Sequence, residues 1–73
     1  MYYFQLYPMK IFLNSKETET QAADVAALAA ELALPKAGVA VAVNSQMVMR
    51  DNWAATPLNE GDDVLIIKAA CGG

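Results

Sequence analysis

The residues of this 73-residue chain that could do chemistry are few, and the most distinctive of them stand last. The sequence ends Lys68-Ala69-Ala70-Cys71-Gly72-Gly73. Because glycine lacks a Cβ atom, a Gly72-Gly73 end can extend or bend at little steric cost and can thread a narrow channel. The terminal carboxylate of Gly73 is unhindered, but it is a poor electrophile and needs activation, for example as an acyl adenylate made with ATP. A partner enzyme would supply the nucleotide, the magnesium and the nucleophile.

Other groups that could do chemistry are sparse. The chain has one cysteine and no histidine, whereas a zinc site or an iron–sulfur cluster needs about four ligands, and an internal disulfide needs a second cysteine. Asp62 and Asp63 are adjacent carboxylates, but neighbouring side chains of a strand point to opposite faces, which argues against an acid–base pair. We therefore expect no bound cofactor, no metal and no enzymatic activity of the chain itself.

The composition excludes several further classes of protein. The net charge is −3, and the five basic residues are scattered along the sequence, so we expect no nucleic-acid partner. No apolar run approaches the roughly 18 residues of a membrane span, and the first residues lack the basic region and cleavage site of a signal peptide. The expectation is a single small cytoplasmic domain without a membrane partner.

A hairpin is the first element that must position the tail. Residues 9–13 are apolar and predict a strand, residues 14–15 (Asn-Ser) form a turn dipeptide, and residues 16–20 are polar but tolerant of β structure. The second strand of this hairpin is expected to be largely solvated.

A short helix follows. Val25, Leu28, Ala29 and Leu32 recur at the spacing of one helical face. Asp24 stands where a carboxylate can cap the first turn. Pro35 is expected to mark the end, which predicts a helix of about 9–10 residues that must dock on a sheet because it would not hold alone.

The second half of the chain returns to strands. Bulky valines alternate with alanines over residues 39–43, which predicts a strand with one bulky face. The last strand, residues 63–69, is apolar on both faces and is therefore expected to be central in its sheet. Between them the sequence predicts a break at 44–45, a short return strand at 46–49, a loop or helical turn at 51–58 and a turn at 60–62.

This order of elements predicts an α+β fold of the β-grasp type, with a mixed sheet of four to five strands and one crossing helix. The expected division is an N-terminal extension of uncertain origin at 1–8, a β-grasp domain at 9–68 and a flexible C-terminal tail at 69–73.

The sequence resembles a known family, the thiamine-pathway sulfur carriers (ThiS), which are ubiquitin-like β-grasp proteins. The likeness runs from Met9 to Gly73, and no single piece of it is decisive, but the ordered set is specific. Its marks are residues 9–14 (MKIFLN), residues 41–44 (VAVN), Val48, Arg50, Trp53, Leu58, Gly61-Asp62, Val64 and Gly72-Gly73.

The resemblance implies a function and partners. Gly73 would be adenylated by a ubiquitin-activating-like adenylyltransferase, which uses ATP, and would then be converted to a thiocarboxylate. Thiazole synthase would receive the sulfur for the thiazole ring of thiamine. Gly72 would permit entry of the tail into both partners.

Three further residues are candidates for contact with a partner. Trp53 is interpreted as a core or lid residue, with a role as a partner hot spot as the alternative. Arg50 either pins the following loop or contacts a partner. Cys71 is no required part of the family motif, and we expect it to have no role. The alternative is that it forms a transient disulfide or persulfide with a partner thiol.

Residues 1–8 are a departure from the family, whose members commonly begin near Met9. Four of the six aromatic residues lie in this extension: Tyr2, Tyr3, Phe4 and Tyr7. Such a β-prone segment could be disordered, or could promote weak self-association.

Rival functions remain open from sequence alone. The molybdopterin-synthase small subunit shares the fold and the tail chemistry, but often has a proline in the approach to Gly-Gly, which residues 68–71 lack. The other rivals are a ubiquitin-like protein modifier and a β-grasp interaction domain with an inert tail.

Overall fold

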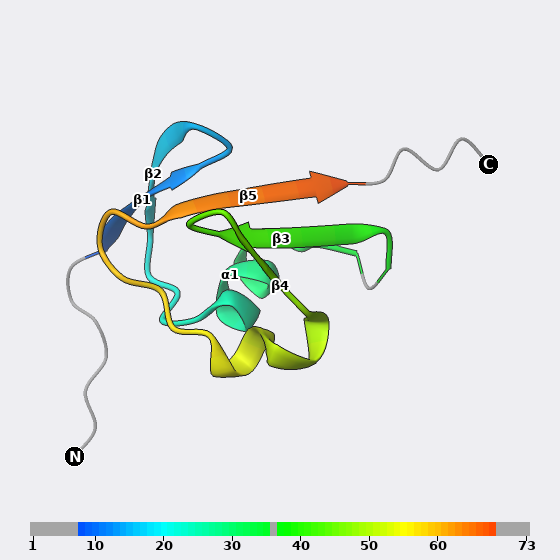
Figure 1. Cartoon of the computed structure of the whole chain (residues 1–73). Helices are drawn as coiled ribbons and strands as arrows, with labels where there is room; N and C mark the ends of the chain where they lie inside the picture. The colour runs from blue at the N-terminus through cyan, green and yellow to red at the C-terminus, as the bar shows by residue number, and fades with distance from the viewer. Residues whose placement is uncertain (1–7, 36, 69–73) are drawn as a thin grey trace, which may run out of the picture.

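The structure is a computed structural model that describes residues 8–35 and 37–68. In this part of the chain two pairs of strands are each followed by a short helix, and a fifth strand comes last (Figure 1). They are β1 (Met9–Leu13), β2 (Lys16–Thr20), α1 (Val25–Glu31), β3 (Val39–Val43), β4 (Gln46–Val48), the 3₁₀ helix η1 (Arg50–Ala55) and β5 (Asp63–Lys68).

Two tight asparagine–serine turns create the two hairpins. Asn14 and Ser15 join β1 to β2 with φ values of 51° and 67°, and Asn44 and Ser45 join β3 to β4 with 51° and 72°. Positive φ at both central residues is typical of two-residue hairpin turns, whose twist matches that of the flanking strands. Asparagine tolerates this left-handed region better than most residues. The hairpin at 9–20 and the break at 44–45 are therefore confirmed.

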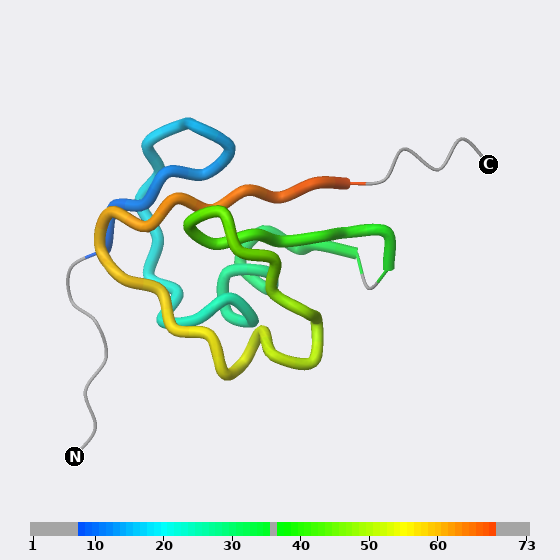
Figure 2. Tube along the Cα trace, in the orientation of Figure 1, coloured from blue at the N-terminus to red at the C-terminus, as the bar shows by residue number. Residues whose placement is uncertain are grey.

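The two hairpins are held together by β5. The strand order is β2-β1-β5-β3-β4, and β5 runs parallel to β1 but antiparallel to β3. Figure 2 shows the same path as a tube, with the first and last described segments side by side. The sheet is thus mixed and five-stranded, and the predicted central position of the last strand beside the first is confirmed.

The helix α1 begins as predicted but ends earlier. The Asp24 carboxylate accepts the Ala27 N–H at 2.7 Å, which caps the first turn. The helix has seven residues instead of nine or ten. It ends in a Schellman motif, because Ala33 adopts φ 55° and the Leu34 N–H donates to the Ala29 carbonyl at 3.0 Å. Pro35 therefore lies beyond the stop, and the prediction that it ends the helix is wrong.

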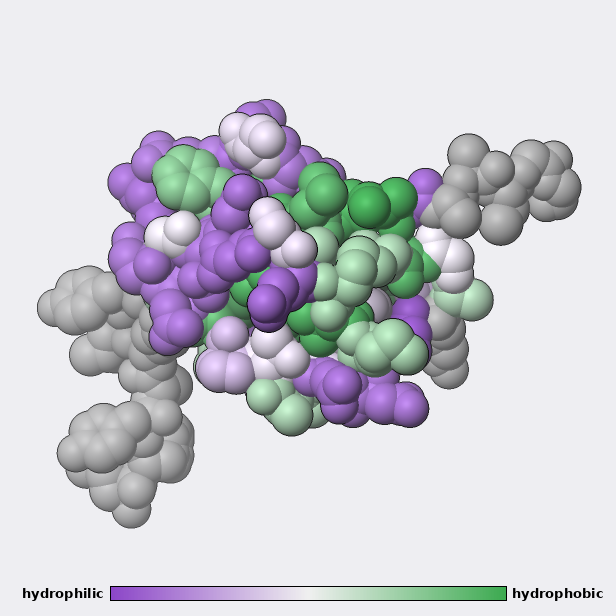
Figure 3. All heavy atoms as spheres, in the orientation of Figure 1, coloured by the Kyte–Doolittle hydropathy of each residue, from purple (hydrophilic) through white to green (hydrophobic). Residues whose placement is uncertain are grey.

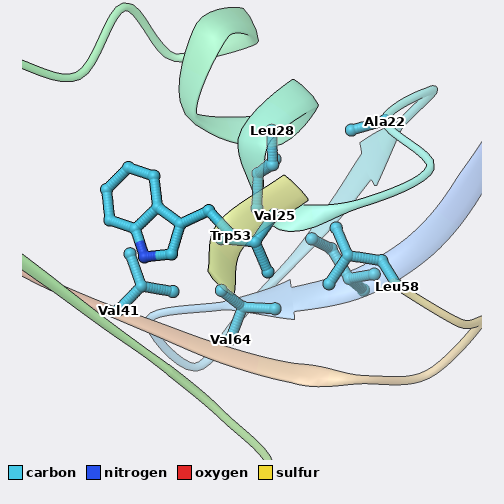
Figure 4. Close-up of a cluster of buried hydrophobic side chains, with 8 residues drawn as sticks. Ala22, Val25, Leu28, Val41, Trp53, Leu58 and Val64 are labelled. Carbon is cyan, nitrogen blue, oxygen red and sulfur yellow. The ribbon is translucent and has the colours of Figure 1, made fainter. Parts of the chain in front are cut away.

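The core lies between the sheet and the two helices (Figure 4). The Trp53 ring from η1 sits between α1 and the sheet in this view. Two backbone bonds tie the η1 segment to the start of α1: Val25 N–H donates to the Thr56 carbonyl at 3.0 Å, and Leu58 N–H donates to the Ala23 carbonyl at 2.9 Å. The core cluster consists of Ile11, Ala22, Val25, Leu28, Val41, Trp53, Leu58 and Val64.

In the described part of the chain, the other face of the sheet carries exposed apolar side chains. Leu65 and Ile67 of β5 are 45% and 47% exposed, and Phe12 of β1 is 43% exposed. Hydrophobic side chains gather on the face shown in Figure 3, over β3 and β5. The apolar character of β5 thus marks a central strand, as predicted, while the described helices α1 and η1 cover only its opposite face.

Candidate functional site

The residues predicted to carry the chemistry, Gly72 and Gly73, lie outside the described residues, as does Cys71. Their predicted roles therefore stay predictions. What the structure does describe is β5, the strand that leads to them, up to Lys68. Within the described residues, the candidate site therefore consists of β5 and the contacts that position it.

The start of β5 is fixed by a polar network. The Asp62 carboxylate accepts the Asn44 side-chain N–H₂ at 3.0 Å and the Asn59 backbone N–H at 2.8 Å. The Asn44 side-chain oxygen in turn accepts the Asp63 N–H at 3.0 Å. Gly61 has φ 85°, and its N–H donates to the Lys10 carbonyl at 2.8 Å. Asp62 thus shapes the turn before the last strand.

The two edges of β5 differ in how many residues pair with a neighbouring strand. β3 pairs with it from Val64 to Lys68, whereas β1 pairs with it only at Asp63 and Val64. Where β1 ends, the Asn14 side-chain oxygen accepts the Ile66 N–H at 2.7 Å. This oxygen replaces the backbone carbonyl that a continuing strand would have supplied.

The structure brings Arg50 and Trp53 together. The Arg50 guanidinium lies 4.4 Å from the centroid of the Trp53 ring, a cation–π contact. The Arg50 Nη2 also donates to the Pro35 carbonyl at 3.2 Å, and the Trp53 Nε1–H donates to the Val48 carbonyl at 3.0 Å.

These contacts tie η1 to the chain before β3 and to β4. Trp53 is 5% exposed and belongs to the core cluster, while Arg50 is exposed and covers it. Trp53 shares this cluster with Val64 of β5, although η1 itself is not part of the sheet. Partner contact by either residue stays a prediction.

Elsewhere the described residues offer no catalytic arrangement. Within residues 8–35 and 37–68 no group of three or more cysteine, histidine or acidic residues could hold a metal. A groove between β4 and η1 is lined mainly by amides, hydroxyls and apolar groups, among them Asn52, Thr56 and Asn59. Its one carboxylate, Asp62, is already engaged in the turn. Neither helix that the structure describes is long and apolar enough to cross a membrane.

Sequence reasoning missed the exposed apolar residues of the outer sheet face. The signal was present, since Phe12 alternates with the buried Ile11, and Leu65 and Ile67 alternate with Val64. Periodicity shows that these side chains face away from the core, but it cannot show whether another element covers them.

The mixed sheet with the order β2-β1-β5-β3-β4 and a helix packed on one face defines the class: a ubiquitin-like β-grasp domain. The crystal structure of the thiamine biosynthesis protein ThiS from Geobacter metallireducens is similar, with a TM-score of 0.74 and 28% sequence identity. The similarity covers 89% of this chain and 100% of that one.

Sequence comparisons identify the family. The sulfur carrier protein ThiS of Escherichia coli (strain K12) is 33% identical over 66 residues, which are 89% of this chain and 100% of that protein. The sequence model of the ThiS family matches residues 2–73. The chain therefore belongs to the ThiS family, and this membership places it among carriers rather than catalysts.

Proposed function

We propose that this chain is the sulfur carrier for thiazole formation in thiamine synthesis, and that it acts through the terminal carboxylate of Gly73. The observation that supports this most is the family match over residues 2–73, together with the Gly72-Gly73 end. Family membership also favours this function over the molybdopterin-synthase small subunit and over a protein modifier.

The chemistry takes place on partner enzymes. A ubiquitin-activating-like adenylyltransferase joins the Gly73 carboxylate to the AMP part of ATP and releases pyrophosphate. A sulfur nucleophile at the oxidation level of sulfide then attacks the acyl carbon, and AMP leaves with the bonding electron pair. The resulting thiocarboxylate donates its sulfur to thiazole synthase. ATP is bound by the partner, and the proposal includes a cytoplasmic location.

The polar groups of the described domain support this division of labour. The carboxylates of Asp24 and Asp62 cap a helix and a turn. Thr20, which is buried, donates its hydroxyl proton to the Glu31 carboxylate at 2.6 Å and accepts the Ala22 N–H at 3.0 Å. Because these groups serve the fold, the domain contributes recognition and stability, while partners contribute catalysis.

The test is intact-mass measurement after incubation with ATP, the adenylyltransferase of thiamine synthesis and a sulfide source. We expect first the acyl adenylate and then a mass gain equal to sulfur replacing oxygen. A variant lacking Gly72 and Gly73 should fold normally and give neither product. If the full chain also gives neither product, the proposed function is wrong.

A second step separates the carrier functions. The purified thiocarboxylate is supplied to thiazole synthase with its other substrates and, in parallel, to a molybdopterin-synthase large subunit with its own substrate. We expect product only in the first reaction. Attachment of the chain to lysines of other proteins would instead indicate a protein modifier.

A further inference from the structure

Among the described residues, part of one edge of β5 has no neighbouring strand. β3 pairs with β5 along its length, but β1 pairs only with Asp63 and Val64, because the chain then turns into β2. We call the β1 side of residues 66–68 the open edge. In Figure 1, β5 extends well past the end of β1 at this side.

The hydrogen bonds show which backbone groups face the open edge. Alternate residues of a strand direct their N–H and C=O groups to opposite sides. Asn44 N–H, from the β3 side, donates to the Asp63 carbonyl at 2.7 Å, whereas Asn14 N–H, from the β1 side, donates to the Val64 carbonyl at 2.9 Å. Odd-numbered residues of β5 therefore bond to β3, and even-numbered residues face β1.

It follows that the Ile66 carbonyl and the Lys68 N–H point into the open edge. The Asn14 side chain satisfies the Ile66 N–H. Among the described residues, no hydrogen bond reaches the Ile66 carbonyl or the Lys68 N–H. One acceptor and one donor, spaced as a strand presents them, are thus available for pairing.

The surface beside the open edge suits a peptide. Leu65 and Ile67 lie on the outer face, 45% and 47% exposed, where alternate side chains of an added strand would contact them. Natural edges are commonly protected by proline, bulges or inward-pointing charges. Residues 66–68 have no proline and carry one charge, on the exposed Lys68.

The distance to the chain end limits what can occupy the edge. Five residues separate Lys68 from the carboxylate of Gly73, and a fully extended chain of that length spans at most about 17 Å. A protein that holds this carboxylate in its active site must therefore lie close to the open edge. A second copy is a poorer occupant, because two chains of net charge −3 repel each other.

We propose that the open edge of β5 receives an extended segment of the adenylyltransferase, which adds to the sheet as a strand beside Ile66 and Lys68. This inference rests on the proposed function, because it describes how the activating partner binds the domain. The added segment donates to the Ile66 carbonyl and accepts from the Lys68 N–H. Pairing of this kind fixes the direction in which the chain leaves the sheet toward the active site.

The first test is amide hydrogen exchange of the ¹⁵N-labelled full chain, alone and with the adenylyltransferase. The Lys68 amide should exchange fast in the free protein and at least about tenfold more slowly in the complex, since a new hydrogen bond must open before exchange. The Ile67 amide is the internal control, because it already faces β3.

Three outcomes of this experiment contradict the proposal. If the enzyme adenylates Gly73 but leaves Lys68 exchange unchanged, strand addition is wrong while the carrier function stands. If no adenylate forms, the proposed function fails and strand addition with it. If Lys68 becomes protected in the free protein as its concentration rises, a second copy occupies the edge instead.

The second test uses a pair of variants. Lys68→Pro removes the N–H that faces the open edge, whereas Lys68→Ala removes the charge and keeps the N–H. Loss of one hydrogen bond should raise the KM for adenylation of Lys68→Pro by about fivefold, while that of Lys68→Ala stays within about twofold. An equal rise in both variants would indicate a charge contact and overturn the proposal. Unchanged exchange of the Ile67 amide verifies that β5 of each variant remains paired with β3.

Discussion

The two faces of the sheet are built from similar residues but do different things. On the inner face, Ile11, Val41 and Val64 are no more than 1% exposed and pack against α1 and η1. On the outer face, Leu65 and Ile67 keep nearly half of their surface in water. The inner face therefore contributes most of the free energy of folding, because burial of apolar area is the main stabilising term. Substitutions on the outer face should change the free energy of unfolding little, and its exposed side chains can contact a partner.

The largest effect is expected from truncation of the helix at the inner face. Leu28→Ala should lower the free energy of unfolding by about 2–5 kcal/mol, since it removes a side chain that is 2% exposed and leaves a cavity. Leu32→Ala is the matched control, one turn later on the helix cap and 38% exposed, and should cost less than about 1 kcal/mol. Urea unfolding measures both, and similar losses would remove the distinction between buried and exposed leucines.

The second largest effect is expected at Trp53, which packs against the inner face of the sheet. Trp53→Phe keeps an aromatic ring but loses the Nε1–H bond to the Val48 carbonyl and weakens the contact with Arg50. We expect a loss of about 1–3 kcal/mol. Arg50→Ala serves as the control and should cost about 1 kcal/mol or less, because the cation is exposed. A larger loss in Arg50→Ala than in Trp53→Phe would show that the arginine, and not the buried indole, holds η1 in place.

A smaller effect is expected at the boundary between β1 and the open edge. Asn14→Gly suits the positive φ of the turn but removes the oxygen that accepts the Ile66 N–H. The net loss should be about 1 kcal/mol. Asn14→Asp keeps an oxygen acceptor and should retain most of the stability. Faster exchange of the Ile66 amide in Asn14→Gly alone would verify the cause, and equal exchange rates in both variants would contradict it.

The smallest effect is expected on the outer face. Ile67→Thr keeps a β-branched side chain and should change the free energy of unfolding by no more than about 0.5 kcal/mol. Substitution by threonine on the inner face of the same strand, Val64→Thr, buries a hydroxyl and should cost about 1–3 kcal/mol. Thermal unfolding of the two variants compares the faces directly. Equal losses would mean that the outer face is also part of the core.

Much of the fold could be predicted from local patterns. Asn-Ser pairs between alternating segments predict both hairpin turns, and Asp24 ahead of an apolar period predicts the helix start. The end of the helix could not be predicted, because Ala33 adopts a positive φ that alanine rarely shows. The tertiary context selects that conformation.

The candidate site was predictable only in part. The Gly-Gly pair predicts a role for residues 72 and 73, but the open edge depends on the register that pairs Phe12 with Asp63. That register joins residues about fifty positions apart, and no local pattern encodes it. The stacking of Arg50 on Trp53 could likewise not be predicted as a contact, although the sequence makes both residues candidates for partner contact.

The position of β5 has a consequence for how the domain folds. Each hairpin closes a two-residue loop and can form early, but the strand that separates β1 from β3 in the sheet comes after both in the chain. Until β5 arrives, the two hairpins have no shared partner, and the entropy of a long loop must be overcome before the sheet is complete. We therefore expect this small protein to fold more slowly than a helical bundle of equal size, with arrival of the final strand as the limiting event.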